Sequence, residues 1–306
     1  MNKNSKVLVT GASGFTGPYM LAALRSKGCY VVAGGQGNKP VKHSFDEWVE
    51  LDLTDRQQVE RAVSSVEPDY VVHLAGISFV GHVDMNAFYE VNVLGTENLL
   101  TALDSLPDNR LKGILIASSA NVYGAPEGGL KISEEQLPDP VNHYAISKLA
   151  MEFVAKKFMA TLPIVIARPF NYIGFGQRES FVIPKIVSAY AAGLDSVELG
   201  SIDVSRDFTS VRDTVAAYSQ LLIEPACHGE VFNVCSSKAL SLSEVLSLMA
   251  EKAGYEIEVI ANPDFIRKHE IKVLRGSNQK IAEVIGWEPK VGIKDALYEM
   301  FEKYQA

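Results

Sequence analysis

Cysteine is scarce in this chain: its 306 residues include only three, at positions 29, 227 and 235. Three scattered cysteines can build neither a disulfide framework nor a metal cluster, and we expect no metal site. Cys29 and Cys235 lie in apolar runs, where we expect buried and unreactive thiols. This cysteine usage favours a reducing compartment, and we expect the protein in the cytoplasm.

Long apolar runs and a basic surplus are also absent. No stretch approaches the roughly 18 apolar residues that a membrane-spanning helix needs, and the apolar run near the start breaks at Thr10-Gly11, which argues against a secretory signal. Lys and Arg number 29 against 37 Asp and Glu, a formal net charge of −8. A nucleic-acid-binding surface would need a concentrated basic face. We therefore expect neither a membrane nor a nucleic acid as partner.

Short β-branched runs alternate with amphipathic stretches over the first two-thirds of the chain. We predict strands at residues 6–10, 30–33, 70–75, 113–118 and 164–168, and helices at 15–27, 85–106 and around 144–148. Continuous apolar strands separated by helices indicate a parallel sheet covered on both faces. The predicted fold class is therefore α/β, a doubly wound Rossmann sheet with ligands at the carboxyl ends of its strands.

The pattern loosens after Arg168-Pro169. We predict helices at 181–192 and 211–224, strands at 196–199 and 230–234, and then a helix from Ser241, a strand at 256–260 and two final helices. Such a chain enters, leaves and re-enters a smaller lobe. We predict a dinucleotide-binding Rossmann domain of residues 1–168 plus about 212–235, and a smaller C-terminal α/β substrate lobe of residues 169–211 and 236–306.

A glycine-rich turn joins the first predicted strand to the first predicted helix. Its glycines follow the spacing Gly-x-x-Gly-x-x-Gly. Without a Cβ they let the backbone turn tightly and approach a pyrophosphate, whose charge faces the helix N-terminus. We therefore predict a dinucleotide site whose contacts come from Gly11, Ser13, Gly14, Phe15, Thr16 and Gly17.

The residues after the second and third strands bear on the type of cofactor. The second strand ends in Ala33-Gly34-Gly35-Gln36, without the carboxylate that usually binds a ribose 2′-hydroxyl. Its absence removes the repulsion that a 2′-phosphate would meet, and Asn38 and Lys39 follow, so NADP(H) is favoured over NAD(H). Asp52-Leu53 follows a third strand and is expected to bind the adenine amine. The alternative is a helix cap at Asp52 or Thr54.

Tyr144 and Lys148 stand one helical turn apart and share a helix face. A nearby ammonium favours phenolate and lowers a tyrosine pKa from its usual value of about 10. That makes Tyr144 a candidate proton donor or acceptor near neutral pH. Solvated helix faces produce the same spacing by chance, so the weight comes from the glycine-rich turn and from the Ser118-Ser119 pair upstream.

Several motifs together resemble the extended short-chain dehydrogenase/reductase family, the group of nucleotide-sugar epimerases, dehydratases and reductases. They are Gly11/Gly14/Gly17, Asp52-Leu53, His73-Leu-Ala-Gly76, Asn92, Ser118-Ser119-x-x-Val-Tyr-Gly124, Tyr144-x-x-x-Lys148 and Arg168-Pro-Phe-Asn171. Within this group the later segments are most similar to the GDP-4-keto-6-deoxy-D-mannose reductases. Those segments are Arg168–Gly174, Gly176-Gln177, Phe181–Lys185, Arg206-Asp-Phe208 and Gly286-Trp287.

The resemblance implies roles for the matching residues. Tyr144 is expected to protonate the sugar carbonyl oxygen during hydride transfer, and Lys148 to tune the phenol and hold the nicotinamide ribose. Ser119 is expected to bind the same oxygen, the alternative being a serine that caps its loop. Asn92 is expected to brace the active-site helix. Further cofactor contacts are implied for Leu74, Ala75 and Gly76.

The resemblance also implies a diphosphate site in the later lobe. Its contacts are Asn171, Lys185, Arg206 and Arg267, since cations would compensate a desolvated diphosphate. Ser119 is the further substrate contact, at the sugar carbonyl. For Arg206-Asp207 the alternative is a local ion pair at the surface. His82 and His143 are read either as sugar contacts or as surface histidines.

The positions after Ser119 discriminate among reactions. Dehydratases of the family carry a glutamate two positions beyond the catalytic hydroxyl residue, whereas this chain has Ala120 and Asn121, neither of which can act as that acid or base. A cysteine beside the serine, as in GDP-fucose synthases, is also absent. We therefore predict NAD(P)H-dependent reduction of the 4-keto group of a nucleotide-linked 4-keto-6-deoxyhexose. GDP-4-keto-6-deoxy-D-mannose would yield GDP-rhamnose or GDP-6-deoxytalose.

Two alternatives remain open from the sequence. One is a nucleotide-sugar 4-epimerase with tightly bound NAD, and the other is a non-catalytic NAD(P) sensor that retains the fold as a binding module. The resemblance further implies a homodimer that packs through the helices around 85–106 and 144–160.

Overall fold

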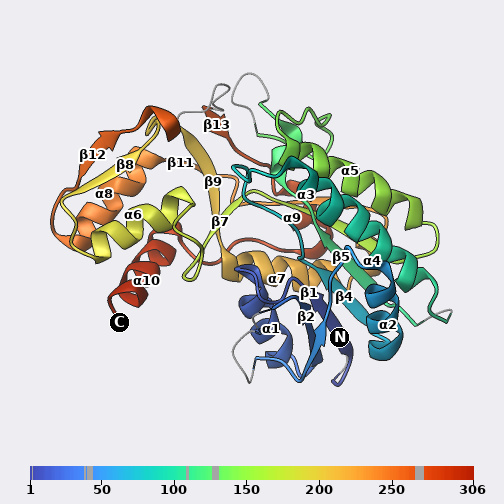
Figure 1. Ribbon diagram of the computed structural model, residues 1–306. Coiled ribbons are helices and arrows are strands. Elements are labelled where there is room, and N and C mark those ends of the chain that lie inside the picture. Colours follow the sequence, from blue (N-terminus) through green and yellow to red (C-terminus); the bar gives the residue numbers. More distant parts are fainter. Residues whose placement is uncertain (2, 38, 40–43, 108–109, 126–130, 266–271) are drawn as a thin grey trace.

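A seven-stranded, all-parallel sheet dominates the computed structural model, which describes residues 1–306 except 2, 38, 40–43, 108–109, 126–130 and 266–271. The strand order is β10-β6-β5-β4-β1-β2-β3, and Figure 1 labels β5, β4, β1 and β2 of this sheet. The strands are β1 (Lys6–Thr10), β2 (Tyr30–Gly35), β3 (Glu47–Glu50), β4 (Tyr70–His73), β5 (Gly113–Ala117), β6 (Ile164–Pro169) and β10 (Val231–Val234). The predicted Rossmann fold is confirmed. The order reverses between β1 and β4, which opens a crevice at the carboxyl ends of these strands.

Helices cover both faces of this sheet because successive strand residues point to opposite sides. In β1, Val7 and Val9 face one layer, and Leu8 faces the other. The first layer contains α1 (Thr16–Ser26), α7 (Val211–Leu221) and α9 (Gln279–Ile285). The second contains α2 (Arg56–Val66), α4 (Gly95–Asp104) and α5 (His143–Phe158). Each fully buried aliphatic side chain in these layers stabilises the fold by about 1.5–3 kcal/mol.

The helix predicted over residues 85–106 is not regular. It consists of α3 (Met85–Tyr89), a π-helical turn η1 (Glu90–Leu94) and α4. Gly95 follows the turn, and a Cβ at this position would lie 2.8 Å from the Leu53 Cβ. Turns of this kind are rare and occur frequently at functional sites. Here the wider turn holds the fully buried amide of Asn92.

A smaller lobe lies beside the large sheet, at the left of Figure 1. Its β9 (Ser205–Ser210) pairs with β7 (Asn171–Ile173), β11 (Ala239–Ser241) and β13 (Val273–Leu274), and β8 (Ser196–Leu199) pairs with β12 (Glu258–Ala261). Helices α6 (Val182–Ala191), α8 (Leu242–Ala253) and α10 (Ile293–Gln305) share an apolar core with these strands. The described residues also form the short helices η2 (Ala120–Tyr123), η4 (Pro225–Cys227) and η5 (Pro263–Phe265).

The domain boundaries remain a prediction. Helix α7 and strand β10 join the large sheet, in line with the proposed return of residues 212–235. Ile281 and Trp287, however, pack in the core of the first helical layer, although the predicted division assigns them to the substrate lobe. The chain therefore crosses back to the large sheet once more than the sequence indicates.

All three cysteines are free and buried, so the predicted burial of Cys29 and Cys235 is confirmed. Among the described residues, no group of three or more His, Cys, Asp or Glu side chains is arranged to hold a metal ion. In the same part of the chain, every helix is too short or too polar to cross a bilayer.

Candidate active site

The glycine-rich turn lies at the crevice between β1 and β4. Gly11 has a φ of +67°, and a Cβ there would lie 2.6 Å from the backbone nitrogen of Ala75. A Cβ on Gly17 would lie 2.0 Å from the carbonyl oxygen of Ala12. These positions therefore exclude any side chain, and the turn packs closely against the segment that follows β4. The backbone is left accessible at the N-terminus of α1, as a bound pyrophosphate requires.

A hollow of about 320 Å³ adjoins this turn. The turn supplies one wall, and the segment after β7 supplies the other through Phe175 and Gly176. The Thr16 Oγ1 lies 2.9 Å from the hydroxyl of Tyr172, and the Phe15 ring stacks on the Tyr172 ring at a centroid distance of 5.8 Å. The smaller lobe thus touches the candidate cofactor turn directly through Tyr172, a candidate site residue that no motif in the sequence singled out.

A carboxylate does reach the loop after β2, which corrects the expectation from the sequence. Glu50, at the end of β3, accepts hydrogen bonds from the backbone N–H of Gly37 at 3.3 Å and from Trp48 Nε1 at 3.2 Å. The neighbouring β3 supplies it because β2 and β3 run in parallel and end together. Lys39 brings a positive charge to the same place, with its Nζ 5.9 Å from the centre of the Trp48 ring. Asn38 lies outside the described residues.

Asp52 follows β3 as predicted, but it does not cap α2. Its carboxylate accepts hydrogen bonds from the backbone N–H and the hydroxyl of Thr54, at 2.8 and 2.7 Å. The cap is Asp55, which accepts from the backbone N–H of Gln58 at 3.0 Å. The alternative of a cap at Asp52 or Thr54 is therefore wrong, and the adenine contact of Asp52-Leu53 remains a prediction.

The structure brings Ser119, Tyr144 and Lys148 together. Asn142 caps α5 by accepting from the backbone N–H of Ala145 at 2.9 Å, which places Tyr144 in the first helical turn. Tyr144 and Lys148 are 7% and 5% exposed. Ser119 follows the end of β5, and its hydroxyl lies near enough to the phenol of Tyr144 to lower the pKa of that phenol.

The alternative interpretation of Ser119, a serine that caps its loop, is confirmed, and its role at the sugar carbonyl oxygen remains a prediction. Its Oγ accepts from the backbone N–H and from the side-chain amide of Asn121, each at 3.1 Å, so Ser119 caps η2. The same hydroxyl faces Tyr144. Ala120 is buried, and the amide of Asn121 is engaged with Ser119. The two positions after the serine thus offer no carboxylate for dehydration.

The pKa values of the pair depart from the sequence prediction. Burial raises the pKa of Tyr144 to about 12, and the hydrogen bond with Ser119 opposes this rise. Burial lowers the pKa of Lys148 to about 8, while the Glu152 carboxylate opposes this fall. Lys148 Nζ donates to the carbonyl oxygen of Ala117 at 2.8 Å. The expectation that Lys148 lowers the pKa of Tyr144 is therefore wrong in direction, because desolvation of the phenol dominates.

Asn92 braces the active-site helix, as expected. Its Oδ1 accepts from the backbone N–H of Ile77 at 2.8 Å, and its Nδ2 donates to the Ile77 carbonyl at 3.2 Å and to Ser147 Oγ at 3.0 Å. Ser147 Oγ donates in turn to the carbonyl oxygen of Tyr144 at 2.8 Å. A fully buried amide thus connects the loop after β4 to the backbone of the helix that carries the candidate proton donor.

His73 is a buried structural residue. Its Nδ1 lies 2.7 Å from Thr10 Oγ1, and its Nε2 lies 2.9 Å from Thr96 Oγ1. Burial lowers its pKa to about 3, with the charge of Lys148 as a smaller cause. The ring is therefore neutral at physiological pH and links β1, β4 and α4 beneath the site.

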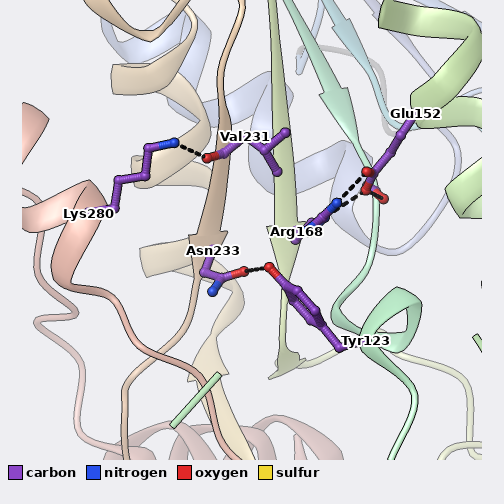
Figure 2. A network of polar contacts seen from close by, with 7 residues as sticks. Tyr123, Glu152, Arg168, Val231, Asn233 and Lys280 are labelled. Atoms are coloured by element: carbon purple, nitrogen blue, oxygen red, sulfur yellow. Dashed lines mark hydrogen bonds and ion pairs between the residues drawn. The ribbon is translucent and has the colours of Figure 1, made fainter. Parts of the chain in front are cut away.

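Figure 2 shows a second polar network, which the sequence analysis did not identify. Arg168 donates from Nε and Nη2 to the two carboxylate oxygens of Glu152, at 2.9 and 2.6 Å. The guanidinium carbon lies 4.8 Å from the centre of the Tyr123 ring, and the Tyr123 hydroxyl donates to Asn233 Oδ1 at 2.8 Å. The network joins α5, β6, η2 and β10. The sequence did contain a sign of this network, because Glu152 stands one helical turn beyond Lys148 and therefore shares its helix face.

Three of the predicted substrate contacts lie on different elements of the smaller lobe. Asn171 is exposed at the start of β7, and Lys185 Nζ lies 4.3 Å from the ring centre of Phe265. Arg206, on β9, donates from Nη1 to the carbonyl oxygen of Ser205 at 2.9 Å. Arg267 lies outside the described residues. The substrate roles of these four residues remain predictions.

Three other expectations concern side chains near the site. Asp207 is fully buried and accepts from the backbone N–H of Ser236 at 2.7 Å, so a surface ion pair of Arg206 and Asp207 is wrong. His82 and His143 are exposed. His143 Nδ1 lies 2.8 Å from the Tyr89 hydroxyl.

Comparison with known proteins agrees with this geometry. Residues 8–300 match the family model described as GDP-mannose 4,6 dehydratase. The chain belongs to this family. It is 35% identical over 298 residues to the GDP-6-deoxy-D-talose 4-dehydrogenase of Aggregatibacter actinomycetemcomitans, covering 97% of both chains. It is 36% identical over 317 residues to the GDP-6-deoxy-D-mannose reductase of Pseudomonas aeruginosa, covering 98% of this chain and 97% of the relative.

Solved structures of family members superpose closely. A Burkholderia cenocepacia J2315 protein, described provisionally as an epimerase, gives a TM-score of 0.92 at 41% identity, over 100% of this chain and 99% of the other. RMD from Pseudomonas aeruginosa, complexed with NADPH, gives a TM-score of 0.85 at 35% identity over 99% of each chain. The resemblance to nucleotide-sugar enzymes of the extended short-chain dehydrogenase/reductase type is therefore confirmed. The family name alone does not decide between dehydration, epimerisation and reduction.

Proposed function

We propose that this protein reduces the 4-keto group of a GDP-linked 4-keto-6-deoxyhexose, with NADPH as the favoured reductant and NADH as the second choice. The observation that carries the proposal is the position of the Ser119 hydroxyl beside the buried phenol of Tyr144, with Lys148 one helical turn away, at the carboxyl edge of the sheet. Similarity to two enzymes named for GDP-6-deoxyhexoses supports the choice of substrate.

The residues of the turn fit a dinucleotide. Gly11 and Gly17 leave no room for a side chain, and the adjoining hollow of about 320 Å³ opens beside Ser13, Gly14 and Phe15. A diphosphate would face the backbone N–H groups at the start of α1. The bound cofactor supplies the hydride that reduces the ketone carbon.

The chain's own residues handle the proton. With a pKa of about 12, the phenol of Tyr144 is protonated at neutral pH and can donate to the ketone oxygen as negative charge develops there. Ser119 can donate to the same oxygen and orient it. Lys148, with a pKa of about 8, is mostly protonated at neutral pH and favours the phenolate that remains. One hydride and one proton convert the ketone to the alcohol.

The choice between NADPH and NADH depends on two opposing charges beside the loop after β2. Lys39 favours a 2′-phosphate, whereas the carboxylate of Glu50 favours a free 2′-hydroxyl. A similar solved structure holds NADPH. In the smaller lobe, we propose that Asn171, Lys185, Arg206 and Arg267 bind the diphosphate and the nucleotide.

A 4-epimerase with tightly bound NAD is the second candidate, favoured by the similarity to the Burkholderia protein described as an epimerase. An epimerase regenerates its cofactor within each turnover, whereas a reductase must exchange it. Protein that is purified with stoichiometric NAD(H), and that needs no added reductant, would establish epimerisation. The Tyr144 phenol, buried beside the Ser119 hydroxyl, argues against a non-catalytic sensor, which has no use for a proton donor.

The deciding experiment is a panel of GDP-, dTDP-, UDP- and CDP-linked 4-keto-6-deoxy sugars, each incubated with NADPH or NADH. Absorbance of the reduced nicotinamide follows the reaction. We expect the GDP-linked ketone to consume NADPH in a one-to-one ratio with the alcohol formed. If no member of the panel consumes either cofactor, the proposed reduction is wrong.

We also propose a cytoplasmic homodimer. Leu94 on η1 and Ile146 and Phe153 on α5 are 53%, 38% and 60% exposed, which leaves large apolar side chains on the helices predicted to form the interface. Exposed apolar groups of this kind favour association. Sedimentation analysis of the wild type and of Phe153→Glu tests the interface, and a monomeric wild type would contradict it.

A further inference from the structure

Three residues of α5 contact three consecutive residues at the end of β5. The helical residues are spaced by four and therefore share one face. Lys148 Nζ donates to the Ala117 carbonyl at 2.8 Å, the Ser118 hydroxyl donates to Glu152 Oε1 at 2.5 Å, and the Ser119 hydroxyl faces the Tyr144 phenol. The two outer contacts are two helical turns apart, about 12 Å along the axis. Two contacts at this separation fix both the position and the rotation of the helix.

Glu152 is itself held by the sheet. Its side chain is 1% exposed, and the guanidinium of Arg168, 5% exposed, contacts both of its oxygens (Figure 2). A buried carboxylate is tolerated only when it is paired and hydrogen-bonded. Arg168 lies on β6, and the backbone N–H of Ser118 donates to the Ala167 carbonyl on the same strand at 2.7 Å. The carboxylate is therefore attached to two adjacent strands.

We propose that Glu152 is a positioning residue of the active site. Through Ser118 and Arg168 it fixes α5 against the end of β5, so that the Tyr144 phenol keeps its position beside the Ser119 hydroxyl. A displacement of about 1 Å in a reacting group can lower a rate by roughly 100-fold, so a second fixed point on the helix matters for turnover. The kinetic readout of this proposal rests on the proposed function.

Electrostatics give Glu152 a second effect. Its carboxylate opposes the fall in the pKa of Lys148 that burial causes. Removing the negative charge should therefore lower that pKa further, and Lys148 should lose its proton at a lower pH. A residue with a purely structural role, remote from Lys148, would not change this titration.

The kinetic test uses Ser118→Ala and Glu152→Gln, each with a matched control. Ser219→Ala removes another buried serine hydroxyl, which donates to the Val215 carbonyl at 2.8 Å on α7. Glu134→Gln removes another carboxylate, which accepts from the backbone N–H of Asn233 at 2.7 Å. We expect Ser118→Ala to lower kcat about 10-fold, with KM changed by less than about twofold. Ser118→Thr keeps the hydroxyl and should recover most of kcat.

Glu152→Gln should lower kcat at least as much and shift the alkaline limb of its pH profile to lower pH. The controls should change neither kcat nor the profile. If Ser118→Ala keeps the kcat of the wild type, or if Ser219→Ala loses as much, the proposal is overturned. Because Glu152→Gln leaves Arg168 without its partner and can fail to fold, the Ser118 variants decide the question by themselves.

A measurement without substrate separates this proposal from the proposed function. The side-chain NMR signal of Lys148, assigned by its loss in Lys148→Met, gives the pKa of the ammonium directly. We expect a lower pKa in Glu152→Gln than in the wild type and an unchanged pKa in Glu134→Gln. Equal pKa values in all three proteins would overturn the electrostatic effect of Glu152, whatever the protein reduces.

Discussion

Asn92 donates a hydrogen bond from its side-chain amide to Ser147 Oγ, 3.0 Å away on the neighbouring helix. Ser147 is three residues beyond Tyr144 and donates to its carbonyl oxygen. The fully buried amide also satisfies the backbone N–H and carbonyl of Ile77. A wider helical turn is what lets this side chain lie inside the helical layer, so the irregular segment η1 serves the position of the candidate proton donor.

Asn92→Ala should therefore reduce both stability and turnover. The substitution leaves the polar groups of Ile77 and Ser147 without their partner, which we expect to cost about 2–3 kcal/mol of the free energy of unfolding. Denaturant unfolding measures this cost, and kcat should fall while cofactor affinity changes little. Asn98→Ala is the matched control. Asn98 lies on α4, which continues the helix from η1, and its Nδ2 also donates to a backbone carbonyl, that of Leu53, at 2.9 Å. Equal losses of kcat in both variants would contradict the positioning role of Asn92.

Tyr144→Phe should remove the proposed proton donor and leave the rest of the site unchanged. The ring remains packed against Phe88, whose centroid lies 6.1 Å away. Proton transfer by a placed side chain accelerates reactions by roughly 100- to 10,000-fold, so we expect kcat to fall by at least about 100-fold. The dissociation constant for NADPH, measured by fluorescence titration, should stay within about threefold of the wild type. Wild-type activity in this variant would exclude Tyr144 from the mechanism.

The rate should fall at alkaline pH with a midpoint near the pKa of Lys148, about 8. Burial lowers this pKa from its usual value of about 10.4, so the ammonium is present below pH 8 and is lost above it. The phenol of Tyr144, with a pKa of about 12, keeps its proton throughout this window. A kcat profile from pH 6 to 10 checks the prediction. Lys148→Met should have a low kcat that does not fall further at alkaline pH. If the alkaline fall persists in this variant, it comes from the titration of another group.

Gly11→Ala should destabilise the protein by strain and collision together. Its φ of +67° disfavours any L side chain, and the added Cβ would lie 2.6 Å from the Ala75 backbone nitrogen. Gly254 is the matched control, because its φ of +82° carries the same strain while a Cβ there would meet no atom of the described residues within 4 Å. We expect Gly254→Ala to cost about 1 kcal/mol in thermal or denaturant unfolding, and Gly11→Ala to cost more and to lose NADPH binding. Similar costs would show that the close approach to Ala75 is unimportant.

The buried parallel strands were predictable because their apolar runs are continuous. The bounds of β1 match the expected 6–10. The bounds of β8, whose apolar residues alternate with polar ones, also match the expected 196–199. Strand β9, by contrast, has the sequence Ser-Arg-Asp-Phe-Thr-Ser, which no hydrophobic pattern marks as a central strand. It lies at the centre of its sheet because Asp207 finds partners in Ser236 and Gly276, which are distant in the sequence. Tertiary contacts of this kind override local propensity.

The candidate site was predictable to a similar extent. Spacing on one helix places Tyr144 beside Lys148, and the loop after β5 brings Ser119 to them. The direction of the pKa shift of Tyr144 was not predictable, since it depends on how completely the fold desolvates the phenol. Glu50 was missed for a related reason: only the pairing of β2 with β3 brings its carboxylate to Gly37.

Asp207 should make stability depend on pH in the direction opposite to most carboxylates. Burial raises its pKa to about 6 despite the hydrogen bonds that it accepts from Ser236 and Gly276. The folded state therefore holds a proton between about pH 4 and 6 that the unfolded chain has already lost, and stability falls as pH rises through this window. The full effect is at most about 3 kcal/mol, since one pKa unit corresponds to 1.36 kcal/mol.

Asp207→Asn removes this titration. The free energy of unfolding of the wild type minus that of the variant should therefore fall as pH rises from 4 to 7. Urea unfolding at a series of pH values measures this difference. Ser236→Ala removes the hydroxyl that donates to Asp207 at 2.6 Å, which should raise the pKa of Asp207 further. The fall in stability should then extend to higher pH than in the wild type. Parallel stability curves for the wild type and Asp207→Asn would mean that the hydrogen bonds fully compensate burial. In that case the contacts of Asp207 on β9 with Ser236 after β10 and with Gly276 after β13 would be as stable with a charged carboxylate as with a protonated one.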